Sequence, residues 1–341
     1  MKSSPVTTTP GYVALYDSGE LARRAKAAWA ILVHCELCPH RCGVNRLAGE
    51  QGVCRMGAQP KVSSWNTHRW EEPPISGTRG SGTIFFSGCT GRCLFCQNYP
   101  ISQLDYGDVV SVERLATMML ELQHKRVHNI NFVTPTHFMP QILAALPHAI
   151  RQGLRAPLVY NSSGYETIES LRLLDGVVDI WLPDAKYDDN RAARRLSGFV
   201  HYVEHNRAAL REIYRQVGSD LVLDEEGIAR RGMIIRHLVL PHGLAGTADV
   251  LHWIAQELSP RVHVSLMDQY FAAHRAIGDP ELGRHLTAEE YEAALEAFDA
   301  AGLERGWRQE TGREGEEEIL RFAHPLKGIC VNDRIGSGGS E

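Results

Sequence analysis

The chain has 341 residues, of which 43% are hydrophobic and 23% are charged, and its formal net charge is −5. These values are typical of water-soluble globular proteins, and no apolar run approaches the roughly 20 residues that a membrane span needs. The acidic balance disfavours a nucleic-acid partner, because phosphate binding requires a clustered basic surface. The first thirty residues lack the basic start and apolar core of a secretory signal, so we expect a cytoplasmic protein with no membrane partner.

Four cysteines follow an Ala-rich, helix-like stretch near the amino terminus and form a C-x2-C-x3-C-x11-C pattern: Cys35, Cys38, Cys42 and Cys54. Four thiolates can close a tetrahedral zinc site, and an iron–sulfur cluster also accepts four sulfurs. The spacing leaves both groups open, as well as the alternative that these cysteines bind no metal. His34 and His40 adjoin the motif, but four cysteines already complete a coordination shell.

Three more cysteines lie directly after the apolar, strand-like stretch 83–86, in a C-x3-C-x2-C pattern: Cys89, Cys93 and Cys96. Three thiolates on one loop leave one iron of a four-iron cluster without a protein ligand, and that iron would be the place where chemistry occurs. A zinc site or simply buried thiols are the alternatives. Seven of the eight cysteines lie between residues 35 and 96, which indicates metal ligands rather than disulfides in a non-secreted protein. Cys330 stands apart and is expected to be a small buried residue.

From residue 80 onward, short apolar runs alternate with helical patterns, which indicates repeated βα units and a parallel sheet of the α/β class. The predicted strands are Thr83–Ser87, Asn129–Val133, Leu158–Asn161, Val178–Leu182, Met233–Leu240 and Val262–Leu266. The predicted helices are Val112–His124, Pro140–Arg151, Thr167–Leu174, Tyr202–Gln216, Ala248–Ala255 and Ala288–Ala301. Periodicity alone allows either an open doubly wound sheet or a partially closed barrel, with the active site at the carboxyl ends of the strands.

The run from Phe86 to Asn98, with an aromatic residue just before its third cysteine, resembles the cluster-binding loop of radical S-adenosylmethionine enzymes. The resemblance implies a partial (β/α)6 barrel and a [4Fe-4S] cluster held by Cys89, Cys93 and Cys96. It also implies that S-adenosylmethionine chelates the open iron and is cleaved to a 5′-deoxyadenosyl radical by one electron from a reductant such as flavodoxin or ferredoxin. We therefore expect a Cys-rich segment over 1–78, the barrel over 79–275, and a helix and tail packing on it over 276–341.

The expected contacts of S-adenosylmethionine are two residues of the cluster loop, Phe95 and Asn98, and residues at the strand ends: Thr134, Thr136, Asn161, Asp184, Lys186 and Arg236. Thr134 and Thr136 stand where many members of the superfamily carry a Gly-Gly-Glu-Pro segment, so the chain departs from that pattern; a turn fixed by Pro135 is the alternative. Asp184 and Lys186 resemble the Asp-x-Lys segment of glycyl-radical-enzyme activases, and an ion pair at the barrel rim is the alternative.

Arg236 interrupts an apolar strand, so its charge needs a carboxylate partner from substrate, cofactor or protein. His237 alternates to the opposite side and is expected to be a satisfied interior residue. Met267, Gln269 and Tyr270 follow the last predicted strand and are expected to line a substrate pocket.

Several segments together resemble a poorly characterised branch related to pyruvate formate-lyase activating enzyme: Cys35–Cys54, Glu71–Gly77, the cluster loop, Thr134–His137 and Ile235–Pro241. The resemblance implies hydrogen abstraction from a small molecule or a peptide whose identity the sequence does not give. Activation of a glycyl-radical enzyme is one alternative, although the simplest activases lack the Cys-rich amino-terminal part. A non-catalytic zinc or metal-binding protein is an alternative of another class.

Overall fold

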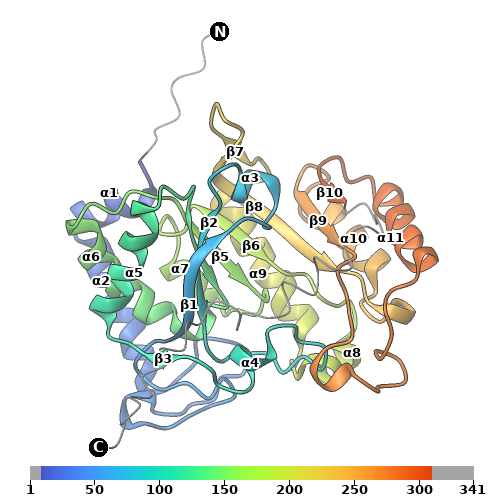
Figure 1. Ribbon diagram of the computed structural model, residues 1–341, viewed down its shortest axis with the longest axis horizontal. Helices are drawn as coiled ribbons and strands as arrows, with labels where there is room; N and C mark the ends of the chain where they lie inside the picture. Colours follow the sequence, from blue (N-terminus) through green and yellow to red (C-terminus); the bar gives the residue numbers. More distant parts are fainter. Residues whose placement is uncertain (1–8, 309–341) are drawn as a thin grey trace, which may run out of the picture. The chain divides into compact units, whose positions relative to one another are not determined.

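A largely parallel sheet forms the centre of the computed structural model, which describes residues 9–308 (Figure 1). It has ten strands in the order β10-β9-β8-β6-β5-β4-β2-β1-β3, with β7 paired to β8. The strands are β1 (Lys61–His68), β2 (Ser81–Phe86), β3 (Asp108–Val109), β4 (Ile130–Val133), β5 (Leu158–Ser162), β6 (Ile180–Pro183), β7 (Val222–Leu223), β8 (Ala229–Leu238), β9 (His263–Met267) and β10 (Gly306–Arg308). From β2 to β10 along this path all neighbours are parallel, whereas β1 pairs antiparallel with β2 and β3.

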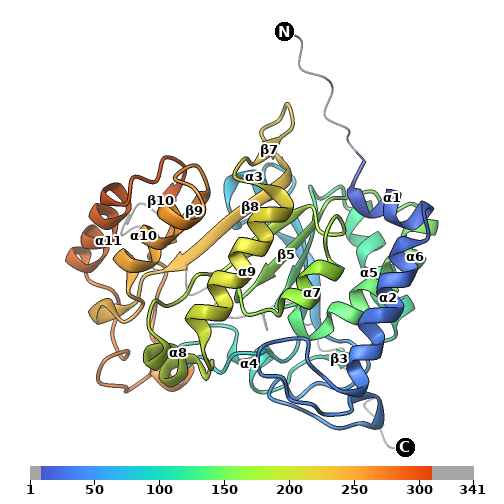
Figure 2. The ribbon, with the colours of Figure 1, turned by 180° about the vertical axis from the view of Figure 1, so that it is seen from behind.

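Most helices cover one face of the sheet (Figure 2). The α-helices of the described residues are α1 (Gly11–Asp17), α2 (Glu20–Ala30), α3 (Pro73–Ser76), α4 (Tyr99–Ser102), α5 (Val112–His124), α6 (Met139–Arg151), α7 (Ile168–Leu173), α8 (Asn190–Ser197), α9 (Tyr202–Val217), α10 (Thr247–Glu257) and α11 (Ala288–Ala300). Helix α6 packs between α2 and α5, while α7 contacts α9 and α10 contacts α11. None of the helices in the described part of the chain combines the length and apolarity that a membrane span requires.

Successive side chains of a strand point to opposite faces of the sheet, so the buried side chains form a separate core on each face. This is expected for parallel strands that are buried on both sides. Ile84 and Phe132 belong to the main core, which the covering helices complete. Val159 and Ile180 belong to a separate core, to which Ile75 of the short helix α3 contributes. The segment after β1 therefore packs against the face of the sheet that the main helical layer leaves uncovered.

The strand order decides between the two architectures that periodicity left open. The six predicted strands are all present, and β2, β4, β5, β6, β8 and β9 follow one another in sequence order across the sheet. A doubly wound sheet would reverse direction at a switch point. The fold is therefore the predicted α/β arrangement of a partial barrel, and its sheet is not closed, because β3 and β10 end the path.

Four strands lie outside the predicted set: β1, β3, β7 and β10. Strand β1 is largely polar, and only its Val62 side chain is fully buried. Its sequence therefore lacks the continuous apolar run that predicts β2. Strand β10 has three residues and depends on pairing with β9. The division at residues 78 and 275 stays a prediction: residues 9–308 belong to one compact unit, and β1 joins the same sheet as β2. Cys330 and most of the expected tail lie outside the described residues.

Candidate functional site

The loop between β2 and α4 carries the C-x3-C-x2-C motif and is fixed by backbone hydrogen bonds at both ends. The Gly88 N–H donates to the Ile101 carbonyl (3.0 Å), and the Arg92 N–H donates to the Ser197 carbonyl (2.7 Å) at the end of α8. Gly88 has a φ of +75°, and a Cβ there would lie 2.7 Å from the Cys54 carbonyl oxygen. Glycine is therefore required, because the loop passes directly against the amino-terminal cysteine segment.

Each of the three thiols in this loop has a polar hydrogen-bond partner. Cys89 Sγ accepts from the backbone N–H two residues onward (3.2 Å), Cys93 Sγ accepts from the Ser197 hydroxyl (2.9 Å), and Cys96 Sγ lies 3.1 Å from the Ser102 hydroxyl. Hydrogen bonds to sulfur are the means by which proteins tune iron–sulfur clusters. The donor set therefore fits a cluster with three protein thiolates.

Burial controls the charge of these thiols. Desolvation raises the pKa of Cys89 to about 12 and that of Cys96 to about 11, and the neighbouring Cys93 adds to both shifts. Without a cation Cys89 and Cys96 stay protonated, whereas a bound metal ion deprotonates a coordinating thiol. Loading of this site with metal must therefore release protons.

Asp184 and Lys186, which follow β6, lie near the same loop. Lys186 Nζ is 2.5 Å from Asp184 Oδ2, so the two side chains form the ion pair that was the alternative to a cofactor contact. Burial opposes the charge of Lys186, but the carboxylate of Asp184 and the thiols of Cys93 and Cys89 outweigh it and raise the pKa of the amine. The structure thus brings together the cluster loop and the Asp-x-Lys segment, which are far apart in the sequence.

The polar residues after β4 and β5 also meet. The Thr134 N–H donates to the Asn161 carbonyl (2.9 Å), and Thr134 has a φ of +57°. The Thr136 hydroxyl donates to Glu166 Oε1 (2.7 Å), and both side chains are buried. Desolvation raises the pKa of Glu166 to about 7. The Thr136 hydroxyl is therefore already engaged by a protein carboxyl group.

Arg236 has protein carboxylates as its partners. Its guanidinium lies 2.7 Å from Glu72 Oε1 and 2.6 Å from Glu71 Oε2. Burial disfavours the charge of Arg236, but Glu72 and Glu71 outweigh this effect and raise its pKa. His237 is fully buried and satisfied, as predicted, with ring nitrogens 2.6 Å from the Ala185 carbonyl and 2.9 Å from the Thr247 hydroxyl.

The remaining predicted contacts differ in exposure. Phe95 is buried, with its ring edge-on to that of Tyr270 at a centroid distance of 5.7 Å. Asn98 is exposed at the start of α4. Phe95, which precedes the third cysteine, thus packs in the core, whereas Asn98 is exposed to solvent.

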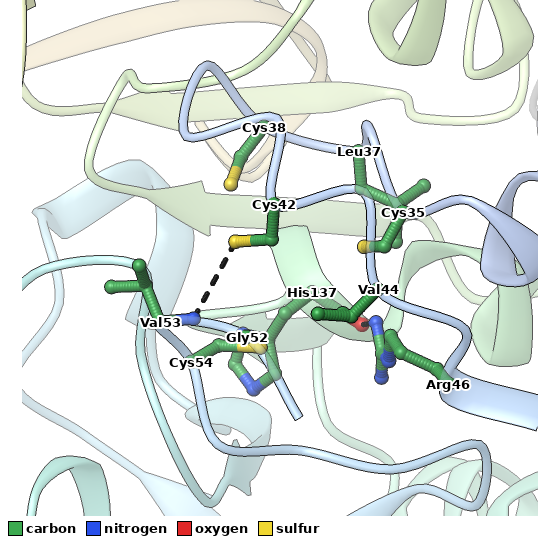
Figure 3. A pocket seen from close by; sticks show the side chains of 10 residues that line it. All are labelled: Cys35, Leu37, Cys38, Cys42, Val44, Arg46, Gly52, Val53, Cys54 and His137. Atoms are coloured by element: carbon green, nitrogen blue, oxygen red, sulfur yellow. Dashed lines mark hydrogen bonds between the residues drawn. The ribbon is translucent and has the colours of Figure 1, made fainter. Parts of the chain in front are cut away.

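The four amino-terminal cysteines line one cavity (Figure 3), whose empty volume is about 340 Å³ including its open side. Gly52 lies so close to Cys42 that a Cβ at position 52 would be 2.6 Å from its sulfur. Arg46 and His137 line the same cavity. Within residues 9–308, no three Cys, His, Asp or Glu side chains gather around the position of one metal ion.

The two cysteine motifs touch each other. His40, within the first motif, places Nε2 2.8 Å from the carbonyl oxygen of Thr90, within the second. Arg92 donates to the Val53 carbonyl, next to Cys54. His40 therefore bridges the two motifs.

Three residues near the thiols were not predicted from the sequence: Ser197, Arg46 and His137. Ser197 precedes the glycine that ends α8, and only tertiary packing brings it to Cys93. Arg46 and His137 carry no spacing signal relative to the cysteines. Arg46 is only 1% exposed. The sequence does not predict this burial, because a charged residue in a polar loop is normally expected to face solvent.

Comparison with known proteins identifies the family to which the chain belongs. Residues 83–223 match the Radical SAM superfamily. An uncharacterized protein of Methanocaldococcus jannaschii is 34% identical over 296 residues, which are 82% of this chain and 79% of that protein.

Two solved structures are similar at low sequence identity. A radical SAM methyltransferase from Sphaerobacter thermophilus has a TM-score of 0.44 and 14% identity over 67% of each chain. HydG, a maturase of the [FeFe]-hydrogenase, has a TM-score of 0.47 and 10% identity, covering 70% of this chain and 54% of its own. With the matched domain beginning in β2 and including the three-cysteine loop, the chain belongs to the radical SAM superfamily.

Proposed function

We propose that this enzyme binds a [4Fe-4S] cluster through Cys89, Cys93 and Cys96 and uses it to cleave S-adenosylmethionine. The observation that carries the proposal is the three-thiol loop, in which each sulfur has its own polar partner. When bound, cluster and cofactor together supply a 5′-deoxyadenosyl radical: one electron breaks the sulfur–C5′ bond, methionine leaves, and the radical takes a hydrogen atom from the substrate. Superfamily membership disfavours the alternative of a non-catalytic metal-binding protein.

Residues at the carboxyl ends of β4, β5 and β6 bind and orient S-adenosylmethionine in this proposal. The Asp184–Lys186 pair offers both a carboxylate and an ammonium group beside the cluster loop, which suits a cofactor that carries both charges. The Thr134 and Asn161 segments are joined by a backbone hydrogen bond and supply further polar groups. Thr136 and Arg236 contribute less directly, because Glu166 and the Glu71–Glu72 pair already engage them.

The substrate in this proposal is a small molecule or a peptide segment, and the electron comes from a protein such as ferredoxin or flavodoxin. Activation of a glycyl-radical enzyme is the second candidate, favoured by the Asp-x-Lys spacing of Asp184 and Lys186. That function predicts a stable protein radical after a suitable partner is added, which electron paramagnetic resonance (EPR) would detect. The four amino-terminal cysteines hold a further metal group, zinc or iron–sulfur.

Anaerobic reconstitution with iron, sulfide, dithionite and S-adenosylmethionine tests the proposal. We expect 5′-deoxyadenosine, measured by chromatography, from the native chain. Cys93→Ala should abolish it, because two thiolates do not hold the cluster, whereas replacement of the separate Cys330 by Ala should leave the rate unchanged. Normal product formation by Cys93→Ala would refute the ligand assignment.

A further inference from the structure

Three arginines gather where the three-cysteine loop meets the amino-terminal cysteine segment: Arg55, Arg92 and Arg275. Arg92 lies within the loop, and its guanidinium donates to the Val53 carbonyl, two residues before Arg55. Arg275 Nη2 donates to the Arg92 carbonyl (2.7 Å). Burial lowers the pKa of Arg92, and the charges of Arg55 and Arg275 lower it further, as like charges do when they lie close together. The three side chains therefore form one basic group, called here the arginine patch.

The arginine patch has no acidic partner in the described part of the chain. Among residues 9–308, no carboxylate forms an ion pair with any of its three guanidinium groups. Arg55 and Arg275 are exposed, and Arg92 is half-buried. Asp105, on the segment after α4, is instead paired with Lys61 (3.1 Å). In a chain whose net charge is −5, the patch is a local reversal of sign, and such a surface attracts an anionic partner.

The arginine patch lies directly beside the thiols of the three-cysteine loop. The Arg92 guanidinium donates to the Ser102 carbonyl (3.2 Å), and the Ser102 hydroxyl lies 3.1 Å from Cys96 Sγ. The neighbouring Gln103 donates from Nε2 to the Cys93 carbonyl (2.8 Å). A molecule seated on the patch would thus be separated from these thiols by about one layer of residues.

Exposed apolar side chains lie on the same segments. Leu104 is 61% exposed, and Ile277, two residues after Arg275, is 73% exposed. The Leu104 N–H donates to the Tyr99 carbonyl (3.0 Å), and the Tyr99 ring stacks on that of His274 at a centroid distance of 4.8 Å, so the two segments touch. Arginine beside exposed apolar side chains suits a protein partner, whereas a nucleic acid needs a longer basic surface.

We propose that the arginine patch docks an acidic one-electron donor protein, which Arg55 and Arg275 attract electrostatically. The proposal rests on the proposed function, in which a cluster at Cys89, Cys93 and Cys96 needs one electron for each cleavage of S-adenosylmethionine. The donor is oxidised by one electron, the cluster is reduced by the same electron, and no bond is made or broken at the docking surface. Charge complementarity of this kind raises the association rate, and its effect falls as ionic strength rises.

Stopped-flow reduction of the full reconstituted chain by a fully reduced acidic flavodoxin tests this inference, with the absorption of the flavodoxin semiquinone as the signal. Arg55→Glu should lower the second-order rate constant about tenfold at low ionic strength, because an attraction becomes a repulsion. Arg275→Glu should also slow the reaction, whereas Arg275→Lys, which keeps the charge, should stay near the native rate. In about 1 M salt the Debye length falls to about 3 Å, so these differences should disappear.

Arg126→Glu is the matched control. Arg126 is exposed, has no ion pair among the described residues and has the same backbone φ as Arg55, +61°. It precedes β4, which is parallel to β2, so it lies at the opposite edge of the sheet from the three-cysteine loop. Arg126→Glu should therefore react at the native rate. Photoreduced 5-deazariboflavin, a small uncharged reductant, provides a second control, and with it Arg55→Glu should also react at the native rate.

The inference would be overturned by a native rate for Arg55→Glu with flavodoxin at low ionic strength, or by equal slowing in Arg126→Glu. An equal loss with 5-deazariboflavin would overturn it too, because the variant would then act on the cluster itself. So would a native protein that 5-deazariboflavin reduces and flavodoxin does not.

The inference and the proposed function fail separately. If the proposed function is wrong, the native chain makes no 5′-deoxyadenosine with either reductant. If only the inference is wrong, 5′-deoxyadenosine forms with 5-deazariboflavin, while the charge at position 55 has no effect on the reaction with flavodoxin.

Discussion

Replacing Arg236 by methionine should destabilise the fold strongly at neutral pH. The change removes the cation that faces two carboxylates, and the side chains of Arg236, Glu71 and Glu72 are only 15%, 7% and 4% exposed. Breaking a buried ion pair by deleting one partner costs about 3–5 kcal/mol, because the other charge is left without compensation. Anaerobic urea unfolding of the reconstituted protein, followed by circular dichroism, measures this loss.

Removing all three charges should cost much less than removing one. The triple variant Arg236→Met, Glu71→Gln, Glu72→Gln leaves no buried charge, so most of the lost stability should return. The pairing holds the pKa of Glu72 below its usual value against the opposing effect of burial, so its favourable contribution is present above pH 4.5 and is lost as pH falls through the folded pKa. The deficit of the single variant should therefore narrow under acidic conditions.

A half-exposed ion pair provides the comparison. Arg230 pairs with Asp224 at the β7–β8 turn, with side chains 29% and 21% exposed, so Arg230→Met should cost less than about 1 kcal/mol. Equal losses for the Arg230 and Arg236 variants would refute the buried-pair reasoning, as would a triple variant no more stable than the single one. If the triple variant is stable but no longer binds S-adenosylmethionine, at least one of these three side chains contacts the cofactor.

Three further changes have defined outcomes. Because the raised pKa of Glu166, about 7 against 4.5, makes the folded state bind more protons, its stability should fall by about 3 kcal/mol as pH rises from 4.5 through 7. Glu166→Gln should reduce the loss of stability in urea unfolding from pH 5 to 8 and leave the part due to Asp179, whose pKa burial also raises to about 7, whereas the exposed Glu169→Gln should retain the full dependence. Ser197→Ala should lower the reduction potential of the [4Fe-4S] cluster in an EPR titration, since Cys93 loses a donor to sulfur; an unchanged potential would contradict this. Lys186→Met should weaken S-adenosylmethionine binding, measured by equilibrium dialysis, with iron content preserved; equal binding would remove Lys186 from the site.

Local patterns predicted the regular elements well because those elements bury continuous apolar runs. The helix α5 begins and ends where predicted, since its buried side chains recur at helical spacing and Ser111 caps its first turn. The six central strands likewise differ from prediction only near their ends. Strand β1 was missed because a largely polar strand with one fully buried side chain has no such run.

The grouping of the cysteines within each motif was predictable from the sequence, but their surroundings were not. Spacing along one loop identifies thiols that can act together, since neighbours in sequence remain neighbours in space. Arg46 and His137 are separated by 91 residues, and their contact depends on how the loop after α2 packs against the end of β4. The partners of Arg236 could not be predicted for the same reason. A charge within an apolar strand indicated that a carboxylate partner exists, but only the fold shows that Glu71 and Glu72 provide it.

Mössbauer spectroscopy of ⁵⁷Fe-reconstituted protein, before and after addition of S-adenosylmethionine, tests most directly whether Cys89, Cys93 and Cys96 leave one iron open. We predict that one iron of that cluster changes its isomer shift when S-adenosylmethionine binds, while the signals of its other three irons stay as they were. A cluster whose four irons are all indifferent to S-adenosylmethionine would contradict the account.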